Sequence, residues 1–342
     1  MKITMLGISG SGKTVYMSAM SALFFQGDVN GYTIANRNDS YSDGTFVFKK
    51  FDEINTLYEK GEFPNGTSSS TVMPLELRYR GNRVLDIDWI DYRGGAIKEL
   101  ASGVENDKNA ELFATLIASD VVLVLVDSVV LHTYSNDMIA RNKVGANEIS
   151  QLLTFVARKK HLDVIFLLTK IDSSFIDIKR DLNVLCKRVE RIYTHFLTET
   201  NTDISMYPII PVGAIGVGNV KTERSKMETA SGSQIDIIKN TVTNYENMHT
   251  IQIAASFATA LLKCLDSETQ NLNTKASKLA NELNRLVEKF SPVKNIIDIL
   301  FFRSKRRGRI FTIEREIDED RMEIKQLEGH RMRLTDIASR PD

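Results

Sequence analysis

The sequence predicts an α/β protein built in three α/β/α layers, with a mostly parallel central sheet, followed by a C-terminal α-helical hairpin. Three observations support this fold class. Short apolar segments alternate with amphipathic helical segments through residue 215, which is typical of parallel strands connected by helices. A glycine-rich turn joins the first predicted strand to the first predicted helix. Beyond residue 248, apolar residues recur at helical spacing over long stretches.

The first strand leads into the segment G-I-S-G-S-G-K-T over residues 7–14. It matches G-x-x-x-x-G-K-[ST], the phosphate-binding P-loop, in which Lys13 reaches the β- and γ-phosphates and Thr14 places its hydroxyl on Mg²⁺. Successive N–H groups of such a loop face an anion, and the N-terminal end of the next helix favours negative charge. A plain glycine-rich turn is the alternative. The predicted phosphate-binding residues are Gly7, Ser9, Gly10, Ser11, Gly12, Lys13, Thr14 and Val15.

The remaining elements of this region follow from apolar runs and helical spacing. The predicted strands are 2–7, 31–36, 72–80, 83–90, 120–127, 162–169 and 206–213, and the predicted helices are 13–25, 45–60, 107–118, 146–159 and 175–199. Residues 131–145 are expected to form a loop. Ligands of such sheets bind beyond the carboxyl ends of the strands, so polar motifs at those ends are the candidate site.

Residues 26–66 are an insert between the glycine-rich unit and the next main strand. We expect an added strand and an added helix there, followed by a mobile loop over 63–71. Thr67, with Thr71 as the alternative, is the candidate to add a hydroxyl to Mg²⁺ when a γ-phosphate is bound. An ordinary polar loop is the other interpretation.

Residues 91–94 form a D-x-x-G motif at the end of a predicted strand. Asp91 can hold Mg²⁺ through water, as the Walker-B acid does, and Gly94 can turn its N–H toward the γ-phosphate. Asp86 and Asp88 are the alternative carboxylates, and their alternation with apolar residues places them on a polar side of the strand.

Residues 169–172 have the sequence T-K-I-D and follow an apolar strand. The carboxylate of Asp172 can accept from both N1–H and N2–H₂ of guanine, donors that adenine lacks on that edge. Lys170 would lay its aliphatic stem along the base and support the P-loop side, with Thr169 completing the motif. A small-residue turn at Gly213 and Ala214 can offer an N–H to guanine O6. A solvated strand end is the alternative for each segment.

Together these motifs resemble the P-loop NTPase domains of TRAFAC-class GTPases, related to the Ras-like small GTPases, over residues 1–216. The most similar group is the bacterial double-GTPase-like family, through the opening K-I-T-M-L-G-I-S-G-S-G-K-T and the later F-P-N-G-T. The resemblance implies binding of GTP or GDP with Mg²⁺, a hydrolysis-driven switch, and switch loops at 61–71 and 91–110 with Thr67 as the switch threonine. It also suggests a bacterial conflict or defence system.

Two departures from the family pattern bear on catalysis. Gly95 stands where Ras-like proteins have a water-orienting Gln, and T-K-x-D replaces N-K-x-D, losing an Asn that ties the base loop to the P-loop. Arg93, or an arginine from a partner, can stabilise the transition-state charge; a solvated role for Arg93 is the alternative. The predicted catalytic residues are Lys13, Thr67, Arg93 and Gly94, and the predicted Mg²⁺ ligands are Thr14, Thr67 and Asp91.

The last third of the chain is predicted as a linker or long loop over 217–247 and a helical arm over 248–342. Within the arm, 251–265 is expected to pack on the sheet, and 267–290 and 311–338 to form an antiparallel hairpin or coiled coil. Residues 296–309 combine an apolar run with basic residues. They fit contact with an anionic membrane surface, contact with a partner protein, or a buried hairpin tip.

Composition restricts the partners. Lys and Arg together number 44, as do Asp and Glu, so no basic field indicates nucleic acid. Two cysteines and the absence of a leader pattern suggest a reduced, cytoplasmic setting. The expected function is a Mg²⁺-dependent GTPase switch that signals to a protein effector or activating protein through the helical arm. The alternatives are a non-hydrolysing, nucleotide-gated interaction protein and a dynamin-like membrane-associated GTPase.

Overall fold

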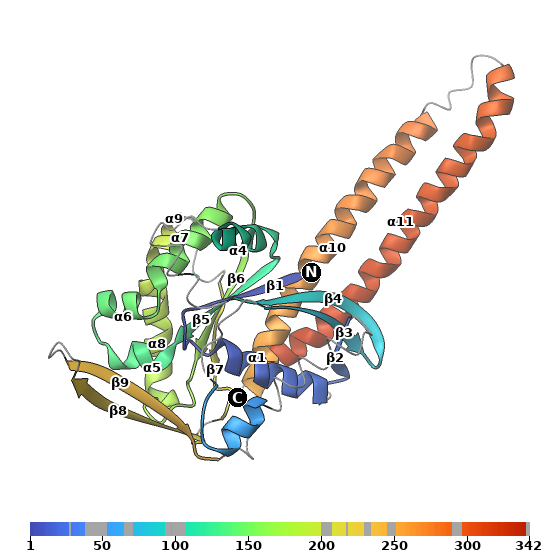
Figure 1. Ribbon diagram of the computed structural model, residues 1–342. Coiled ribbons are helices and arrows are strands. Elements are labelled where there is room, and N and C mark those ends of the chain that lie inside the picture. The colour runs from blue at the N-terminus through green and yellow to red at the C-terminus, as the bar shows by residue number, and fades with distance from the viewer. Residues whose placement is uncertain are drawn as a thin grey trace. The chain divides into compact units, whose positions relative to one another are not determined.

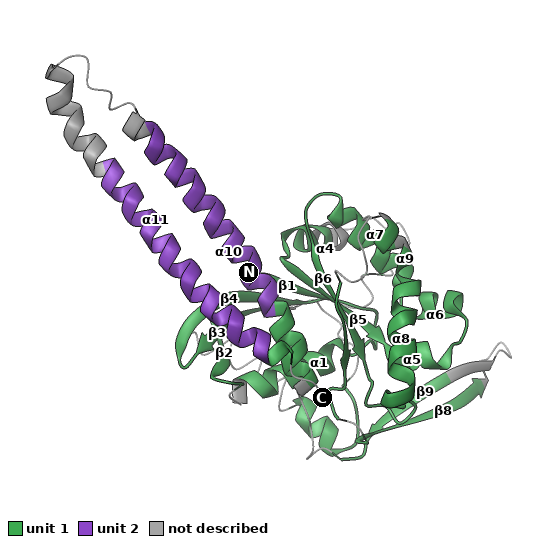
Figure 2. Cartoon of the chain, turned by 180° about the vertical axis from the view of Figure 1, so that it is seen from behind, with its two compact units in different colours: residues 1–260, 337–342 green, residues 261–336 purple. Residues whose placement is uncertain are grey.

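The computed structural model of the chain describes residues 1–26, 29–37, 53–64, 71–92, 97, 107–199, 207–216, 218–228, 234–244, 251–288 and 296–339. These residues form an α/β protein with a mostly parallel central sheet and a C-terminal helical region. Figure 2 shows two compact units, residues 1–260 with 337–342, and residues 261–336. The first unit therefore continues through the segment predicted as a linker and into the helix that follows it.

The central sheet has seven strands in the order β2-β3-β4-β1-β5-β6-β7 (Figure 1). The pairs β2–β3 and β3–β4 are antiparallel, and the four other pairs are parallel. Every predicted strand is present, with small shifts at the ends. Their bounds are β1 Lys2–Leu6, β2 Tyr32–Asn36, β3 Thr71–Tyr79, β4 Asn82–Asp91, β5 Val121–Asp127, β6 Asp163–Thr169 and β7 Ile209–Val212.

The central parallel strands are apolar because both of their faces are covered. All residues of β5 are buried, as are six of the seven residues of β6. On one face, side chains of these strands join a core with apolar residues of α4, α7 and α8. Trp89 of β4 packs elsewhere, against the rings of Tyr16 from the first helix and Phe257 from the helix after residue 250.

The helices of the first unit follow the prediction with two exceptions, the first being that the predicted helix 175–199 is divided at Tyr193 into two helices. Their bounds are α1 Lys13–Ser21, continued by a π-helical turn Ala22–Gln26, α4 Asp107–Ala118, α5 Ser128–Thr133, α6 Asp137–Lys143, α7 Ala146–Ala157, α8 Ile178–Ile192 and α9 Thr194–Glu199. The expected loop over 131–145 is wrong, since it contains the end of α5 and all of α6. Asp127 and Asn136 cap these two short helices by accepting backbone N–H groups.

The insert contains the added strand β2, which pairs with β3 at the edge of the sheet. Of the added helix, the structure describes 53–59, which are helical. Ile54 and Tyr58 of this stretch pack against Ile215, and Phe63 packs against the same cluster. The loop over 65–70 lies outside the described residues.

The predicted linker over 217–247 is wrong in its secondary structure. It contains the strands β8 Val220–Glu228 and β9 Gln234–Val242, which pair antiparallel as a separate hairpin. The prediction failed because only the root of the hairpin is buried, at Val220, Thr222 and Val242, while residues 223–227 are exposed. The alternation of apolar and polar residues that marks a half-buried strand therefore extends over too few residues.

The second unit consists of parts of two long helices, α10 Ile251–Glu288 and α11 Ile296–Ala338. Three ion pairs in antiparallel order join them: Asp266 with Arg331, Lys275 with Asp320, and Glu282 with Arg309. Leu272, Ile317 and Leu327 are buried between them, which confirms the predicted hairpin. The predicted break near residue 266 is wrong, because α10 is one continuous helix.

None of the helices in the described part of the chain is long and apolar enough to cross a membrane. Residues 296–309 belong to α11, but the side chains of 296–308 lie outside the described residues. Contact of this segment with a membrane or a partner therefore remains a prediction.

Candidate functional site

The glycine-rich loop turns sharply between β1 and α1. Gly12 is the N-cap residue of α1 and has φ +96°, a left-handed conformation that favours glycine over other residues. Ser11 N donates to Ile8 O at 3.2 Å, and Tyr16 N donates to Gly12 O at 2.8 Å. The loop thus leads directly into a helix N-terminus, the local structure that binds anions.

Lys13 projects back into this loop. Its Nζ donates to Gly7 O at 2.6 Å and to Ile8 O at 3.0 Å, and the residue is only 5% exposed. Burial lowers the pKa of Lys13 to about 8, an effect that the nearby Asp91 carboxylate partly offsets. A cation at the mouth of a helix N-terminus, held by two carbonyls, can move its donors to a phosphate oxygen when an anion arrives.

Thr169, at the end of β6, connects the T-K-I-D segment to the glycine-rich loop through a hydrogen bond. Its Oγ1 donates to Ser11 O at 2.7 Å and lies 3.2 Å from Val126 O, and Thr169 is buried. The expectation that T-K-x-D loses this tie is wrong, because the threonine hydroxyl reaches the loop carbonyl. The prediction missed this contact because it considered only the side-chain amide that Asn would have at this position of the motif.

Replacing Thr169 with valine should keep the shape of the side chain and remove this tie. We expect a loss of about 1 kcal/mol in unfolding free energy and about fivefold weaker phosphate-ligand affinity, because one buried hydrogen bond disappears and the loop loosens. Chemical denaturation and calorimetry measure the two effects. Thr198→Val, which removes an exposed hydroxyl bonded within its own helix, is the control, and equal effects in both variants would contradict the role of Thr169.

Asp172 is buried at 4% exposure and holds the small-residue turn that follows β7. Its Oδ2 accepts from Ile215 N at 2.8 Å and from Gly216 N at 3.1 Å. Burial raises the pKa of Asp172, and the two amides lower it in part. A Cβ at Gly213 would come 3.0 Å from the Cβ of Asp172, so the close approach of the turn to the aspartate favours glycine.

The backbone N–H groups of this turn differ in their hydrogen-bond partners. Gly213 N donates to Gln252 Oε1 at 2.8 Å, and those of Ile215 and Gly216 donate to Asp172. Among the described residues, no hydrogen bond engages the Ala214 N–H, and Ala214 lines the cavity described below. One donor of the turn is therefore available to a ligand.

Lys170 has a left-handed backbone with φ +62°, which is uncommon for a residue other than glycine. Its Nζ is 2.6 Å from Asp127 Oδ2. The ammonium group therefore bonds to the end of β5, whereas the sequence interpretation directed it to the glycine-rich loop. Asp127 was missed as a partner, although a lone carboxylate ending an otherwise apolar strand is the kind of signal that could have identified it.

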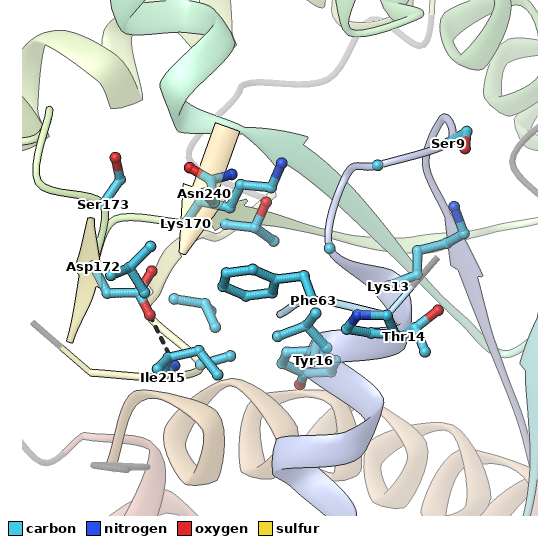
Figure 3. Close-up of a pocket in the computed structure, with 18 residues that line it drawn as sticks. Ser9, Lys13, Thr14, Tyr16, Phe63, Lys170, Asp172, Ser173, Ile215 and Asn240 are labelled. Atoms are coloured by element: carbon cyan, nitrogen blue, oxygen red, sulfur yellow. Dashed lines mark hydrogen bonds between the residues drawn. The ribbon is translucent and has the colours of Figure 1, made fainter. Parts of the chain in front are cut away.

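One cavity of about 240 Å³ brings the two predicted motifs together. Figure 3 shows Lys13 and Thr14 at one end and Asp172 with Ser173 at the other, with Phe63 between them in this view. The predicted residues that line it are Ser9, Gly10, Gly12, Lys13, Thr14, Val15, Thr169, Lys170, Asp172 and Ala214. Gly7, Ser11 and Gly213 adjoin the cavity through the hydrogen bonds given above.

Residues that were not predicted as site residues also line this cavity. Phe63 begins the F-P-N-G-T segment of the insert, Ser173 follows the T-K-I-D segment, and Val220 and Asn240 come from the hairpin β8–β9. Nothing in the sequence pattern marks Asn240, because its place depends on how a polar hairpin folds back on a loop far away in the chain.

Asp91 ends β4 opposite Met5 of β1, and it is fully buried. Its charge acts on Lys13, which lines the cavity beside Thr14, whereas Asp91 itself lies behind the lining. The described residues contain no cluster of three or more His, Cys, Asp or Glu that could hold a metal alone. One carboxylate and one hydroxyl still fit Mg²⁺, which prefers oxygen ligands and usually combines one or two protein groups with phosphates and water.

Several predicted residues lie outside the described part of the chain. Thr67 and its alternative, the side chain of Thr71, belong to this group, as do Arg93, Gly94 and Gly95. Their predicted roles at the γ-phosphate remain predictions.

No protein-family model matches the chain, and a search of curated proteins found no match either. The function of the site must therefore be argued from its residues and their geometry.

Proposed function

We propose that the protein is a Mg²⁺-dependent GTP-binding protein and GTPase with the three-layer fold of P-loop NTPases. The observation that supports this most is that Lys13 and Asp172, which belong to widely separated motifs, line the same cavity. One end has the loop geometry and cation of a phosphate site, and the other has a buried carboxylate next to a free backbone donor. A nucleotide has the same polarity, with phosphates at one end and a base at the other.

Guanine suits the base end better than adenine. The carboxylate of Asp172 is an acceptor-only group when ionised, so it matches the N1–H and N2–H₂ donors of guanine. The free N–H of Ala214 matches the O6 acceptor. The apolar stem of Lys170 and the ring of Phe63 offer surfaces for the flat base.

Thr14 and Asp91 are the residues that would hold Mg²⁺, Asp91 through water. The ion, when bound, would neutralise negative charge on the phosphate oxygens. The chain's own contribution is to bind and orient the phosphates through the loop amides and Lys13. Thr67, Arg93 and Gly94 are the residues proposed to act at the γ-phosphate.

Helix α10 is the proposed route from the site to a protein effector or activating protein. Gln252 in its first turn accepts from Gly213 N, and Ser256 Oγ lies 3.0 Å from Tyr16 OH of α1. Phe257 packs against Phe24 and the Trp89 ring. The turn after β7 and helix α1, which both contribute residues to the cavity lining, therefore contact the same two turns of α10, and the helix continues without a break to Glu288.

Steady-state hydrolysis tests the enzymatic part of this proposal. The protein with Mg²⁺ should convert GTP to GDP, measured by chromatography of the released nucleotide, and chelation of Mg²⁺ should abolish turnover. ATP should not be hydrolysed.

Tight GTP binding without any turnover would favour a second candidate function, that of a non-hydrolysing nucleotide-gated interaction protein. Gly95, which stands in place of a water-orienting Gln, supports this candidate. A cytoplasmic location is part of the same proposal.

The pH dependence of GDP affinity provides an independent test. The pKa of Lys13 is lowered to about 8 in the free protein, so the ammonium form that binds phosphate is complete below that pH and decreases above it. Affinity should change little between about pH 7 and 7.5 and then fall, approaching tenfold per pH unit above 8.

The variant Lys13→Arg is the matched control for this pH profile. Arginine stays charged throughout the range, so its affinity, although lower at neutral pH because the geometry differs, should not fall above pH 8. A decline of the same size in both proteins would assign the titration to another group.

A further inference from the structure

The hairpin β8–β9 forms part of the cavity wall, although it follows the predicted GTPase region and no motif marks it. Val220 on β8 and Asn240 on β9 both line the cavity. In Figure 3 the side chain of Asn240 lies near Lys170. A polar side chain has thus been placed among the residues expected to surround the nucleoside half of a nucleotide.

The root of the hairpin is fixed to the loop that contains Asp172. Ser173 forms a parallel bridge with Val220, and Ser174 N donates to Val220 O at 3.0 Å. In return, Thr222 N donates to Ser174 Oγ at 2.9 Å. These contacts immediately follow Asp172 in the chain, so the position of β8 is set relative to the predicted base-reading carboxylate.

A chain of side-chain hydrogen bonds then orients Asn240. Thr222 Oγ1 donates to Asn240 Oδ1 at 2.8 Å, across a directly opposed strand pair. Thr222 Oγ1 also lies 2.6 Å from Ser173 Oγ. Since the single proton of Thr222 is used toward Asn240, Ser173 is the donor in that bond. Ser173 and Thr222 are both buried, so the chain is shielded from water.

These hydrogen bonds fix the orientation of the Asn240 side-chain amide, which carries both an acceptor and a donor group. The amide oxygen of Asn240 accepts from Thr222. Among the residues that the structure describes, no hydrogen bond engages the amide nitrogen, which has two N–H donors, and Asn240 lines the cavity. Asp172 offers acceptors at the same end, so Asn240 adds the opposite hydrogen-bonding character.

We propose that Asn240 is a specificity-determining residue that donates from Nδ2 to an acceptor atom of the nucleoside, on the base or the ribose. Thr222 and Ser173 are the positioning residues that set its orientation. This inference rests on the proposed function, because it requires a nucleotide in the cavity. It assigns a role in ligand recognition to the hairpin, which the family resemblance does not cover.

The experiment compares GDP and inorganic pyrophosphate binding by calorimetry in four proteins: wild type, Asn240→Asp, Asn240→Ala and Ser225→Ala. Asn240→Asp keeps an oxygen that accepts from Thr222 but replaces the donor by an acceptor. Asn240→Ala removes both groups. Ser225 is exposed farther along the same hairpin, so Ser225→Ala is the matched control.

We expect GDP affinity to fall about 3- to 10-fold in Asn240→Ala and about 10-fold or more in Asn240→Asp. Pyrophosphate, which would occupy only the phosphate end, should bind all four proteins equally. The same loss with 2′-deoxy-GDP would indicate a base contact, and a loss absent with 2′-deoxy-GDP would indicate a contact to the ribose hydroxyl.

Two results would overturn the inference while leaving the proposed function intact. One is wild-type GDP affinity in both Asn240 variants. The other is an equal loss of GDP and pyrophosphate binding, which would mean that the substitutions disturb the cavity as a whole. Failure of the wild type itself to bind GDP would instead refute the proposed function, and the role of Asn240 with it.

Discussion

Lys13→Ala is expected to weaken the binding of GDP and GTP by about 100-fold or more, because the ammonium group would contact the β-phosphate of GDP, and the β- and γ-phosphates of GTP, through charge-assisted hydrogen bonds of about 1.5–3 kcal/mol each. The fold should persist. Lys13 is buried with a pKa lowered by desolvation, so its charge costs stability and its removal relieves that cost. Calorimetric titration measures the affinity, and thermal unfolding shows whether the protein is folded.

The control for Lys13→Ala is Lys179→Ala, which removes an exposed lysine at the start of α8 in the same unit. It should bind both nucleotides like the wild type. Affinity of Lys13→Ala within threefold of the wild type would contradict the assignment of this end of the cavity to phosphate.

The second large effect is expected at Asp172, where two substitutions separate stability from recognition. Asp172→Ala leaves the N–H groups of Ile215 and Gly216 without their acceptor, at a cost of about 1–3 kcal/mol for each buried donor. Asp172→Asn keeps one side-chain oxygen for these amides and should lose much less. Chemical denaturation with both variants measures this difference.

Nucleotide affinity, in contrast to stability, should depend on the charge of residue 172 and on whether its side chain donates or accepts hydrogen bonds. Asn offers one acceptor and one NH₂ donor where guanine requires two acceptors, so Asp172→Asn should lose about 10- to 100-fold in GDP affinity while ADP affinity stays unchanged. A variant that unfolds like the wild type and still prefers GDP over ADP by the same factor would show that Asp172 has only the structural role of holding the turn.

The parts of this protein that sequence patterns predict well are those in which function or burial restricts every position. The apolar runs of β5 and β6 mark central strands because both faces are covered. The glycine-rich loop and the T-K-I-D segment are recognisable because a tight turn and a polar strand end need those residue types. Their meeting at one cavity follows from the carboxyl ends of parallel strands lying at one edge of the sheet.

The parts that were missed depend on contacts between distant residues. The hairpin β8–β9 is buried only at its root, at Val220, Thr222 and Val242, which is too short to give an alternating pattern, and this root is held by hydrogen bonds with Ser173 and Ser174. The short helix α6 begins at the cap Asn136, and its Asp137 pairs with Arg188 of α8, which is distant in the chain. The hydrogen bond from Thr169 to Ser11 could not be predicted from the sequence. Its acceptor is a backbone carbonyl, which every residue type has, so the identity of residue 11 does not indicate the contact.

Titration of the wild-type protein with GDP, GTP and ATP in the presence of Mg²⁺ tests the central claim most directly. The account predicts one site for each guanine nucleotide and an affinity for ATP lower by about 100-fold or more, since ATP leaves the buried carboxylate of Asp172 without donors. Equal affinities for GTP and ATP would contradict the role of Asp172, and the absence of any nucleotide binding would contradict the identification of the cavity as a nucleotide site.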